Sequence, residues 1–384
     1  MIKSSLEMIK RLIAFDTTSR LSNLALIDFV RSILEDHGIK SDLVYDASGK
    51  KANLYATIGP EDRPGILLSG HTDVVPVDGQ PWDSDPFVVH EKGGKLYGRG
   101  TSDMKSFLAV ALALLPEFQS RQLRTPIHLA FSYDEEVGCL GVRRLIDELK
   151  ARAMKPRLCI IGEPTLMQPI TAHKGKKSLH CHVHGLESHS ALSHLGVNAV
   201  EAAAEIVAHL KGMARRKRDH GPFDAAFSPP YTTIHTGTIE GGTALNIVPR
   251  DCRFDFEFRF LPGDDPDALI AEVRRYAESL LPEMHAVSKA AGITVEISNA
   301  VPALAAAPDD EVVLLAQALS GANSTGKVSF ATEGGLFQEA GIPTVICGPG
   351  SIEQAHKPNE FIDLDQIRQC ETFMRRLIEQ AAAR

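Results

Sequence analysis

The sequence lacks an apolar run long enough to cross a membrane. Its longest apolar run, residues 107–115, ends at Pro116, whereas a membrane-spanning helix needs roughly 20 residues. The N-terminus has no continuous apolar stretch of the secretory type either. Apolar residues recur there at helical spacing among Lys and Glu, namely Ile2, Leu6, Ile9, Leu12 and Ile13. We therefore expect no membrane partner and a location in the cytoplasm.

Cysteine pairs and an excess of positive charge are also missing. The six cysteines lie far apart in the chain without a Cys-x-x-Cys spacing, so we interpret them as reduced core residues. The 49 acidic side chains outnumber the 41 basic ones and give a net charge of −8. This charge repels phosphate backbones and argues against nucleic acid as a general partner.

Three common catalytic motifs are absent. The chain contains no His-Glu-x-x-His, no Gly-x-Ser-x-Gly and no Gly-x-x-x-x-Gly-Lys-Ser/Thr segment. Serine-hydrolase and P-loop chemistry therefore lose their usual sequence support.

The apolar pattern predicts an α/β protein with an insertion. Up to about Lys174, β-rich apolar runs alternate with helix-like stretches, which favours a largely parallel sheet covered on both faces. Between residues 178 and 298 the order becomes β-α-β-β-α-β, which is typical of a small ferredoxin-like domain. The α/β alternation resumes from about Pro308. One α/β domain interrupted by a separate α+β domain accounts for this order.

A predicted strand ends in a His that is followed two residues later by an Asp, in Leu67-Leu68-Ser69-Gly70-His71-Thr72-Asp73. Open α/β sheets bind ligands at the carboxyl ends of their strands. One ring nitrogen of His71 can bind a metal there while Asp73 accepts a hydrogen bond from the other. A capping or turn role is the alternative.

A Gly-rich loop, residues 98–105, leads into an apolar predicted helix. It nearly matches a dinucleotide fingerprint, but Asp103 stands at the third glycine position and would repel a pyrophosphate. Nucleotide binding is therefore disfavoured. The carboxylate of Asp103 either bridges two cations or caps the helix.

Further acids and a second His follow other predicted strands. Asp134, Glu135 and Glu136 follow the strand predicted over 127–132, with Tyr133 between. Adjacent carboxylates repel one another, so this segment either holds a cation and a catalytic base or is a solvated loop. Glu163 follows another strand, and His356 lies in the late α/β segment. Together the five segments supply nitrogen and oxygen ligands suited to zinc or a related ion.

These five segments, in this order, resemble the M20 family of metallopeptidases and aminoacylases over essentially the whole chain. The resemblance implies a zinc-peptidase-like α/β catalytic domain with a central, mostly parallel sheet. Residues 1–175 and 301–384 would form it, interrupted by an α+β, ferredoxin-like lid or dimerisation domain over 176–300. Aminopeptidase members tend to have Asp where this chain has Glu163, which favours a deacylase whose substrate is a small N-acylated amino acid. A catalytically silent protein that keeps the fold is the alternative from another class.

The resemblance also implies two Zn²⁺ per chain, with Co²⁺ as a possible substitute. His71, Asp103 and Glu163 would bind one ion. Asp103, Glu136 and His356 would bind the other, so that Asp103 bridges the pair. Glu135 would be the general base, and Asp73 would support His71. Family members often have a cis peptide bond after the bridging Asp, here between Asp103 and Met104.

In the inserted domain, His189 resembles a residue that stabilises the oxyanion in the partner subunit's active site, so the resemblance implies a homodimer through this domain. Asn246 and Arg259 resemble residues that hold the α-carboxylate of the substrate, which suits the planar guanidinium. A structural salt bridge is the alternative for Arg259. Three further histidines alternate along a predicted strand and share one face, so a metal site is one interpretation of them. The resemblance places no ligands there and favours an ordinary sheet face for His180, His182 and His184.

Overall fold

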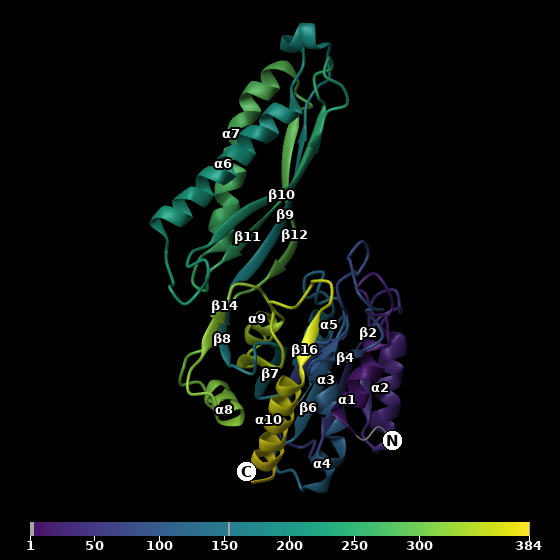
Figure 1. The fold of residues 1–384 in the computed structure, drawn as a ribbon. Helices are drawn as coiled ribbons and strands as arrows, with labels where there is room; N and C mark the ends of the chain where they lie inside the picture. The colour runs from purple at the N-terminus through teal and green to yellow at the C-terminus, as the bar shows by residue number, and fades with distance from the viewer. Residues whose placement is uncertain (1–3, 153, 384) are drawn as a thin grey trace. The chain divides into compact units, whose positions relative to one another are not determined.

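The computed structural model describes residues 4–152 and 154–383, so Ile2 lies outside the described residues. The chain divides into two compact units, shown in Figure 1. The first unit comprises Met1–Ala172, Leu304–Lys327 and Thr332–Arg384, and the second comprises His173–Ala303 and Val328–Ala331. None of the helices in the described ranges has the length and apolar content needed to cross a membrane.

The main sheet of the first unit is parallel at its centre and antiparallel towards its edges. Its strands follow the order β1-β2-β6-β3-β7-β15-β8-β13, and β14 pairs with β8. β3 runs parallel to both β6 and β7, and β15 runs parallel to β7. The strands are β1 (Ser41–Tyr45), β2 (Ala52–Ile58), β3 (Ile66–His71), β6 (Ile127–Ser132), β7 (Leu158–Pro164), β8 (Ile170–His173), β13 (Leu304–Ala305), β14 (Gly326–Val328) and β15 (Thr344–Gly348). The predicted fold class is confirmed.

Helices cover both faces of this sheet. Every residue of β3, β6 and β7 is buried, as expected for parallel strands without a solvated face. Residues from α1, α2, α3, α8 and α10 form one apolar core with the strands, while α5 and α9 contact the sheet and each other outside that core. The helices are α1 (Ser5–Ile13), α2 (Leu24–Asp36), α3 (Lys105–Ala113), α4 (Leu115–Ser120), α5 (Gly141–Ala151), α8 (Glu311–Ser320), α9 (Gly334–Glu339) and α10 (Leu364–Ala383).

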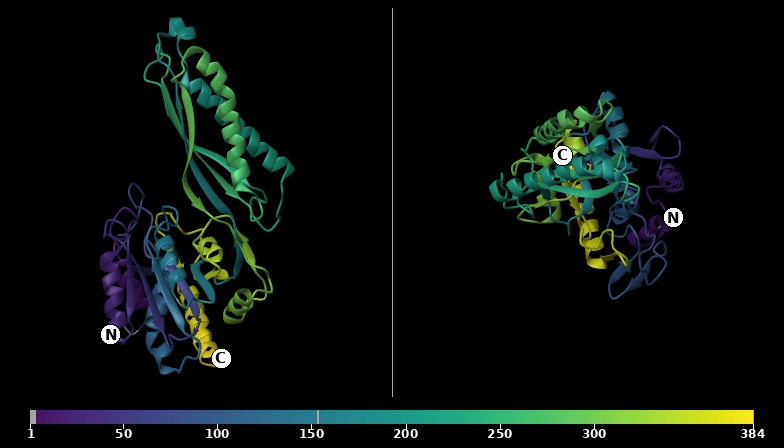
Figure 2. Two further views of the ribbon diagram at one scale, coloured as in Figure 1. Left: turned by 180° about the vertical axis from the view of Figure 1, so that it is seen from behind. Right: turned by 90° about the horizontal axis from the view of Figure 1, so that it is seen from above.

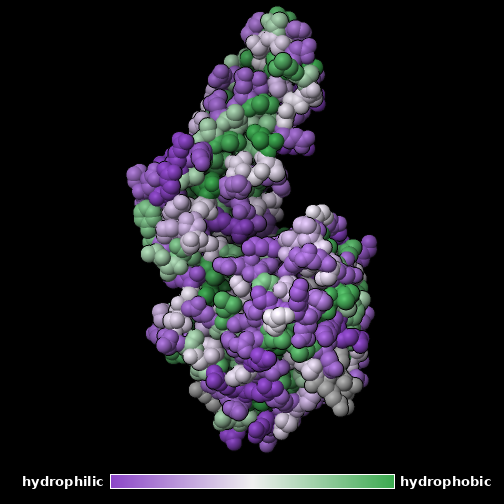
Figure 3. Space-filling model, viewed as in Figure 1, coloured by the Kyte–Doolittle hydropathy of each residue, from purple (hydrophilic) through white to green (hydrophobic). Residues whose placement is uncertain are grey.

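Apolar residues of the first unit are concentrated inside it. In α1, Met8, Ile9, Leu12 and Ile13 are buried, the helical spacing that the sequence predicted. In Figure 3, hydrophilic side chains predominate on the visible surface of this unit, with hydrophobic ones in small patches between them. All six cysteines are free and buried, which confirms their interpretation as reduced core residues.

A small three-stranded sheet lies beside the main one in the first unit. It has the order β16-β5-β4 and consists of β4 (His90–Lys92), β5 (Lys95–Tyr97) and β16 (Phe361–Asp363). Because β5 directly precedes the loop that contains Asp103, and β16 directly follows the loop that contains His356, their antiparallel pairing brings these two loops together.

The second unit has the predicted β-α-β-β-α-β order. Its antiparallel sheet follows the order β10-β11-β9-β12, with α6 and α7 on one face (Figures 1 and 2). Phe254, Phe256 and Phe258 alternate along β11 and are buried in the core under these helices. The elements are β9 (Gly175–His184), η1 (Ser190–Leu195), α6 (Ala199–His220), β10 (Thr233–Gly241), β11 (Asp251–Phe260), α7 (Pro266–Val287) and β12 (Gly292–Val301).

Candidate metal-dependent active site

Four chain segments meet at the carboxyl edge of the main sheet, and the Asp103 loop contacts two of them. β3, β6, β7 and β15 are parallel neighbours, so their carboxyl ends and the loops that follow lie at one edge. His71 ends β3, and Glu163 lies at the end of β7. Glu135 and Glu136 follow β6, and His356 lies in the loop after β15. The sheet therefore gathers residues that are almost 300 positions apart in the chain.

His71 lies between carboxylates on one side and a backbone carbonyl on the other. Its Nδ1 is 2.8 Å from the carbonyl oxygen of Asp73 and 3.5 Å from Oδ1 of the same residue. Both the backbone carbonyl and the carboxylate of Asp73 therefore face Nδ1 of His71, and the contact with the carbonyl is the shorter one. The supporting role of Asp73 stays a prediction. Nε2 of His71 is 3.1 Å from Asp103 Oδ1 and 3.7 Å from Glu163 Oε1.

Asp103 lies between the two histidines. Its Oδ1 faces His71, and its Oδ2 is 3.3 Å from Nε2 of His356. The same nitrogen of His356 is 3.0 Å from Glu136 Oε2. The N-cap residue of α3 is Met104 and not Asp103, so the capping alternative is wrong. The peptide bond between Asp103 and Met104 is cis, as the resemblance implied.

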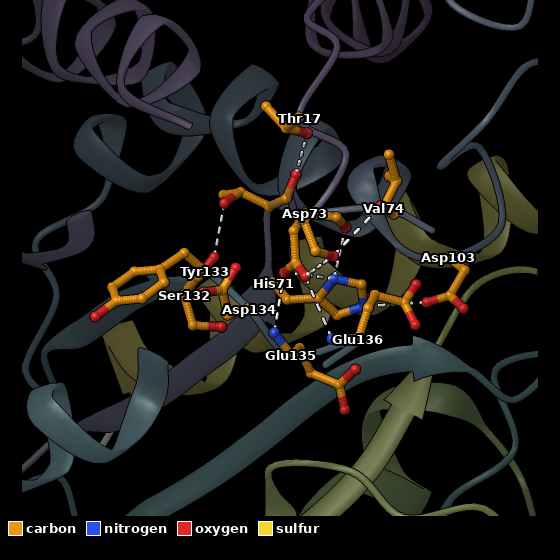
Figure 4. A network of polar contacts seen from close by, with 12 residues as sticks. Thr17, His71, Asp73, Val74, Asp103, Ser132, Tyr133, Asp134, Glu135 and Glu136 are labelled. Carbon is orange, nitrogen blue, oxygen red and sulfur yellow. Dashed lines mark hydrogen bonds and ion pairs between the residues drawn. The ribbon is translucent and has the colours of Figure 1, made fainter. Parts of the chain in front are cut away.

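Only two of the three consecutive acids belong to this cluster. Asp134 pairs instead with Lys51, at 2.5 Å between Nζ and Oδ1. The side chain of Glu136 is 7% exposed, so the solvated-loop alternative is wrong. The Asp73 carboxylate accepts hydrogen bonds from the backbone N–H groups of Glu135 at 3.1 Å and Glu136 at 3.3 Å. Asp73 thereby positions the acidic segment beside His71 (Figure 4).

Burial strongly perturbs the acids of the cluster. Burial raises the pKa of Glu135 to about 8 and the pKa of Glu136 to about 7. Burial, with the nearby charge of Asp103, also raises the pKa of Glu163 well above its usual range. A buried carboxylate resists ionisation unless a cation neutralises it. These three acids therefore favour a positively charged ligand.

The two histidines and Asp103 respond in the opposite direction. Hydrogen bonds with Asp103 and Glu136 raise the pKa of His356 to about 10. Burial opposes the charge on His71, but its contacts with Asp103 and Asp73 raise its pKa well above the usual range. Burial also opposes ionisation of Asp103, yet the two imidazoles hold its pKa low. The protonated imidazoles thus stabilise the negative charge of Asp103. Divalent cations bound between these side chains would stabilise the same charge.

The donor atoms lie close enough together to bind metal ions. His71, Asp103 and Glu136 each offer an atom within 4.8 Å of the others, and so do His71, Glu135 and Glu163. Imidazole nitrogen with carboxylate oxygen is the ligand set that zinc accepts. The chemistry of these residues therefore fits a metal. The second group includes Glu135, for which the resemblance implied the role of base.

A buried ion pair that the sequence analysis missed holds the Asp103 loop. Glu360 is 1% exposed, and its Oε2 accepts hydrogen bonds from Arg99 Nη1 at 2.8 Å and Gly100 N at 3.0 Å. Its Oε1 accepts from the backbone N–H groups of Ser102 at 2.8 Å and Asp103 at 3.1 Å. Glu360 comes four residues after His356, so one carboxylate connects both loops. Arg99 between two glycines was the available sequence signal.

A second missed acid, Glu333, lies buried beneath the cluster. It accepts a hydrogen bond from Ser132 Oγ at 2.5 Å and a longer one from Ser69 Oγ at 3.5 Å. Both serines belong to strands that lead into the site, β6 and β3. Burial raises the pKa of Glu333 to about 7. Nothing in the sequence around Glu333 distinguishes it from a surface acid.

The remaining predicted site residues lie in the second unit. The backbone N–H of Ser190, next to His189, donates to the carbonyl of Asn246 at 3.0 Å, so the two loops are neighbours. Nδ1 of His189 accepts a hydrogen bond from the backbone N–H of Ala191 at 3.1 Å. Nε of Arg259 donates to Glu257 Oε1 at 2.9 Å, which is the salt bridge given above as the alternative.

Comparisons with known proteins agree on one family. A family model described as peptidase family M20/M25/M40 matches residues 67–380. An acetylornithine deacetylase of Proteus mirabilis is 37% identical over 95% of this chain and 92% of its own length. One from Pasteurella multocida is 34% identical over 99% of this chain and 98% of its own length. The crystal structure of Bacillus subtilis YxeP, described as a dinuclear metal-binding M20 peptidase, shares the fold, with a TM-score of 0.64 and 15% identity over 99% of this chain and 98% of that one.

Proposed function

The chain belongs to peptidase family M20/M25/M40, and on this basis we propose that it removes the acetyl group from N²-acetyl-L-ornithine. The products are L-ornithine and acetate, and the reaction serves arginine biosynthesis in the cytoplasm. Family membership makes the chain a hydrolase that acts on amide bonds. One observation carries the choice of substrate: two relatives that match more than nine-tenths of the chain, at 37% and 34% identity, are both acetylornithine deacetylases.

The M20 family is metal-dependent, and two zinc ions at the cluster are part of this proposal, with cobalt as a substitute. His71, Asp103 and Glu163 would hold one ion, and Asp103, Glu136 and His356 would hold the other. The position of Asp103 between the two imidazoles, at 3.1 and 3.3 Å, supports its role as the shared ligand. When bound, such ions supply Lewis-acid activation of water and of the amide carbonyl.

Glu135 moves the proton in this mechanism. Its carboxylate takes a proton from the attacking water and gives it to the nitrogen of the departing amino acid. Burial raises the pKa of Glu135 to about 8, and a cation beside it would lower that pKa towards the range in which a carboxylate accepts a proton at neutral pH. The hydrogen bond from its backbone N–H to Asp73 keeps the carboxylate beside His71. General acid–base catalysis of this kind contributes about 10²- to 10⁴-fold to the rate.

The second unit contributes substrate binding in a homodimer. His189 stabilises the oxyanion in the partner subunit, and Asn246 and Arg259 bind the α-carboxylate of the substrate. The loops that contain His189 and Asn246 lie next to each other, which supports the proposal that both residues contact the same substrate molecule. Arg259 contacts Glu257 through Nε, which leaves its two terminal nitrogens to form the bidentate contact that carboxylates favour.

A substrate panel on metal-loaded protein tests the proposed function. The panel contains N²-acetyl-L-ornithine, other N-acetyl amino acids, N-succinyl-L,L-diaminopimelate and dipeptides. We expect the highest kcat/KM for N²-acetyl-L-ornithine. A higher value for another N-acyl amino acid, for the succinylated substrate or for a dipeptide would move the chain to another M20 activity. No hydrolysis of any compound by metal-loaded protein would contradict the proposal.

A further inference from the structure

The sheet of the second unit has a polar face opposite α6 and α7. Along β9, the buried Leu179, Cys181 and Val183 alternate with histidines. β11 alternates in the same way, so its acidic and basic residues share the face with these histidines. The strands that carry this face, β9 and β11, are the two central ones of the sheet (Figure 1).

Two of the histidines and one aspartate converge on this face. Asp251 lies directly opposite His184 in the antiparallel register of β11 and β9. His182 is the next residue of β9 on the same face, within diagonal reach of Asp251. Both His182 Nε2 and His184 Nδ1 are 2.9 Å from a single oxygen, Asp251 Oδ1. The donor atoms of all three residues lie within 4.8 Å of one another.

We propose that His182, His184 and Asp251 bind a divalent transition-metal ion of the zinc type, at a site separate from the catalytic cluster. Two imidazoles and a carboxylate are zinc ligands, and calcium and magnesium favour oxygen ligands instead. Three protein ligands leave one tetrahedral position open. The side chains are 35%, 44% and 38% exposed, so that position faces solvent.

β12, which pairs with β9 on the side away from β11, leaves space beside the three proposed ligands. Gly292 and Thr294 of β12 pair with His184 and His182 in register. Among the described residues, no other atom lies within 4 Å of the place where a Cβ of Gly292 would stand. The side of the cluster next to Gly292 is therefore open to water or a small anion.

Two arginines lie beside the cluster, and Arg253 of β11 is opposite His182 in register. Arg250 donates from Nε to the other oxygen of Asp251, Oδ2, at 2.9 Å, and so orients the carboxylate with Oδ1 towards the imidazoles. Two histidines aimed at one exposed oxygen add little stability as ion pairs, because exposed pairs are worth roughly 0–1 kcal/mol. His180 on the same strand contacts Asp255 at 2.5 Å and lies opposite Glu296 of β12 in register. Because it belongs to none of the candidate metal groups of the described residues, it serves as a matched control.

The test compares metal content between full-length variants. Wild type, the double variant His182→Ala/His184→Ala, Asp251→Asn and the control His180→Ala are each equilibrated with Zn²⁺ or Co²⁺ and freed of unbound ions. Metal per chain is then counted, and the visible absorption of bound Co²⁺ is recorded. Circular dichroism establishes that each variant is folded. If the double variant does not fold, the metal content of Asp251→Asn still tests the proposal.

We expect the double variant and Asp251→Asn to bind one ion per chain fewer than wild type, with loss of one set of Co²⁺ absorption bands. His180→Ala should bind as many ions as wild type. Equal metal content in all four proteins would overturn the proposal, and so would the same loss in His180→Ala. Because the result is a difference between variants, it does not depend on how many ions the catalytic cluster holds or on whether the chain hydrolyses any substrate.

Discussion

Replacing Glu360 by Gln tests whether one buried carboxylate holds the loop that positions Asp103. The two oxygens of Glu360 accept four hydrogen bonds, at 2.8 to 3.1 Å, from Arg99 and from the backbone of residues 100, 102 and 103. Glutamine keeps one acceptor oxygen and turns an amide N–H₂ towards the other two donors. At least two of the four hydrogen bonds are therefore lost.

The expected loss of stability follows from the burial of the pair. Arg99 is 1% exposed, so its charge would stay buried without its counter-ion. Breaking a buried ion pair by removing one partner costs about 3–5 kcal/mol. The lost hydrogen bonds are part of this figure and are not added to it. We therefore expect Glu360→Gln to lower the free energy of unfolding of the first unit by about 3–5 kcal/mol.

Denaturant unfolding followed by tryptophan fluorescence measures this loss. Trp82, the one tryptophan of the chain, belongs to the first unit, and its ring lies 5.1 Å from the guanidinium carbon of Arg99. Glu353→Gln is the control, because it removes the same charge from an exposed position of the same loop. Surface changes of this kind stay within about 0.5 kcal/mol. A loss in Glu360→Gln no larger than that of the control would refute the reasoning.

Three further predictions concern proton transfer, subunit contact and pH. Glu135→Gln should keep the metal content of wild type and lose about 10²- to 10⁴-fold in turnover; loss of an ion would make Glu135 a ligand, and unchanged turnover would remove it from catalysis. His189→Ala should lower kcat without changing metal content. Heterodimers of a His189→Ala chain with a His71→Ala chain should recover part of the activity. Verified heterodimers that recover no activity would contradict the action of His189 in the partner subunit. Burial lowers the pKa of His128 from 6.5 to about 4. As the pH is lowered from about 6.5 to 4, the imidazole therefore takes up a proton in the unfolded chain but not in the folded one, and the free energy of unfolding falls. His128→Leu should reduce the slope of the free energy of unfolding against pH in this range by up to about 1.4 kcal/mol per pH unit. An unchanged slope would contradict the lowered pKa of His128.

The sequence predicts those parts of the site that follow from periodicity. The apolar runs before His71, Glu135 and Glu163 predict strands, and because these strands lie next to one another in a sheet, their carboxyl ends meet. The same patterns predict the order of elements in the second unit, where six alternating apolar segments become β9, α6, β10, β11, α7 and β12. Strand and helix patterns are reliable here because each element buries one or both faces.

Contacts between loops have no such pattern. Glu360 and Glu333 resemble surface acids in the sequence, and only the tertiary structure shows that they are buried. Three consecutive acids do not reveal which of them point into the site. In the structure Asp134 has φ 54° and pairs with Lys51, while its two neighbours lie beside His71. The three-residue strands β4, β5 and β16 are too short for periodicity to detect.

The central claim is that buried acids and imidazoles hold the ions on which amide hydrolysis depends. Metal content and the hydrolysis of N²-acetyl-L-ornithine should be measured on one preparation, as purified, after removal of metal by a chelator, and after return of Zn²⁺. The account predicts that activity disappears with the ions and returns with them. Unchanged hydrolysis by protein that holds no metal would contradict it.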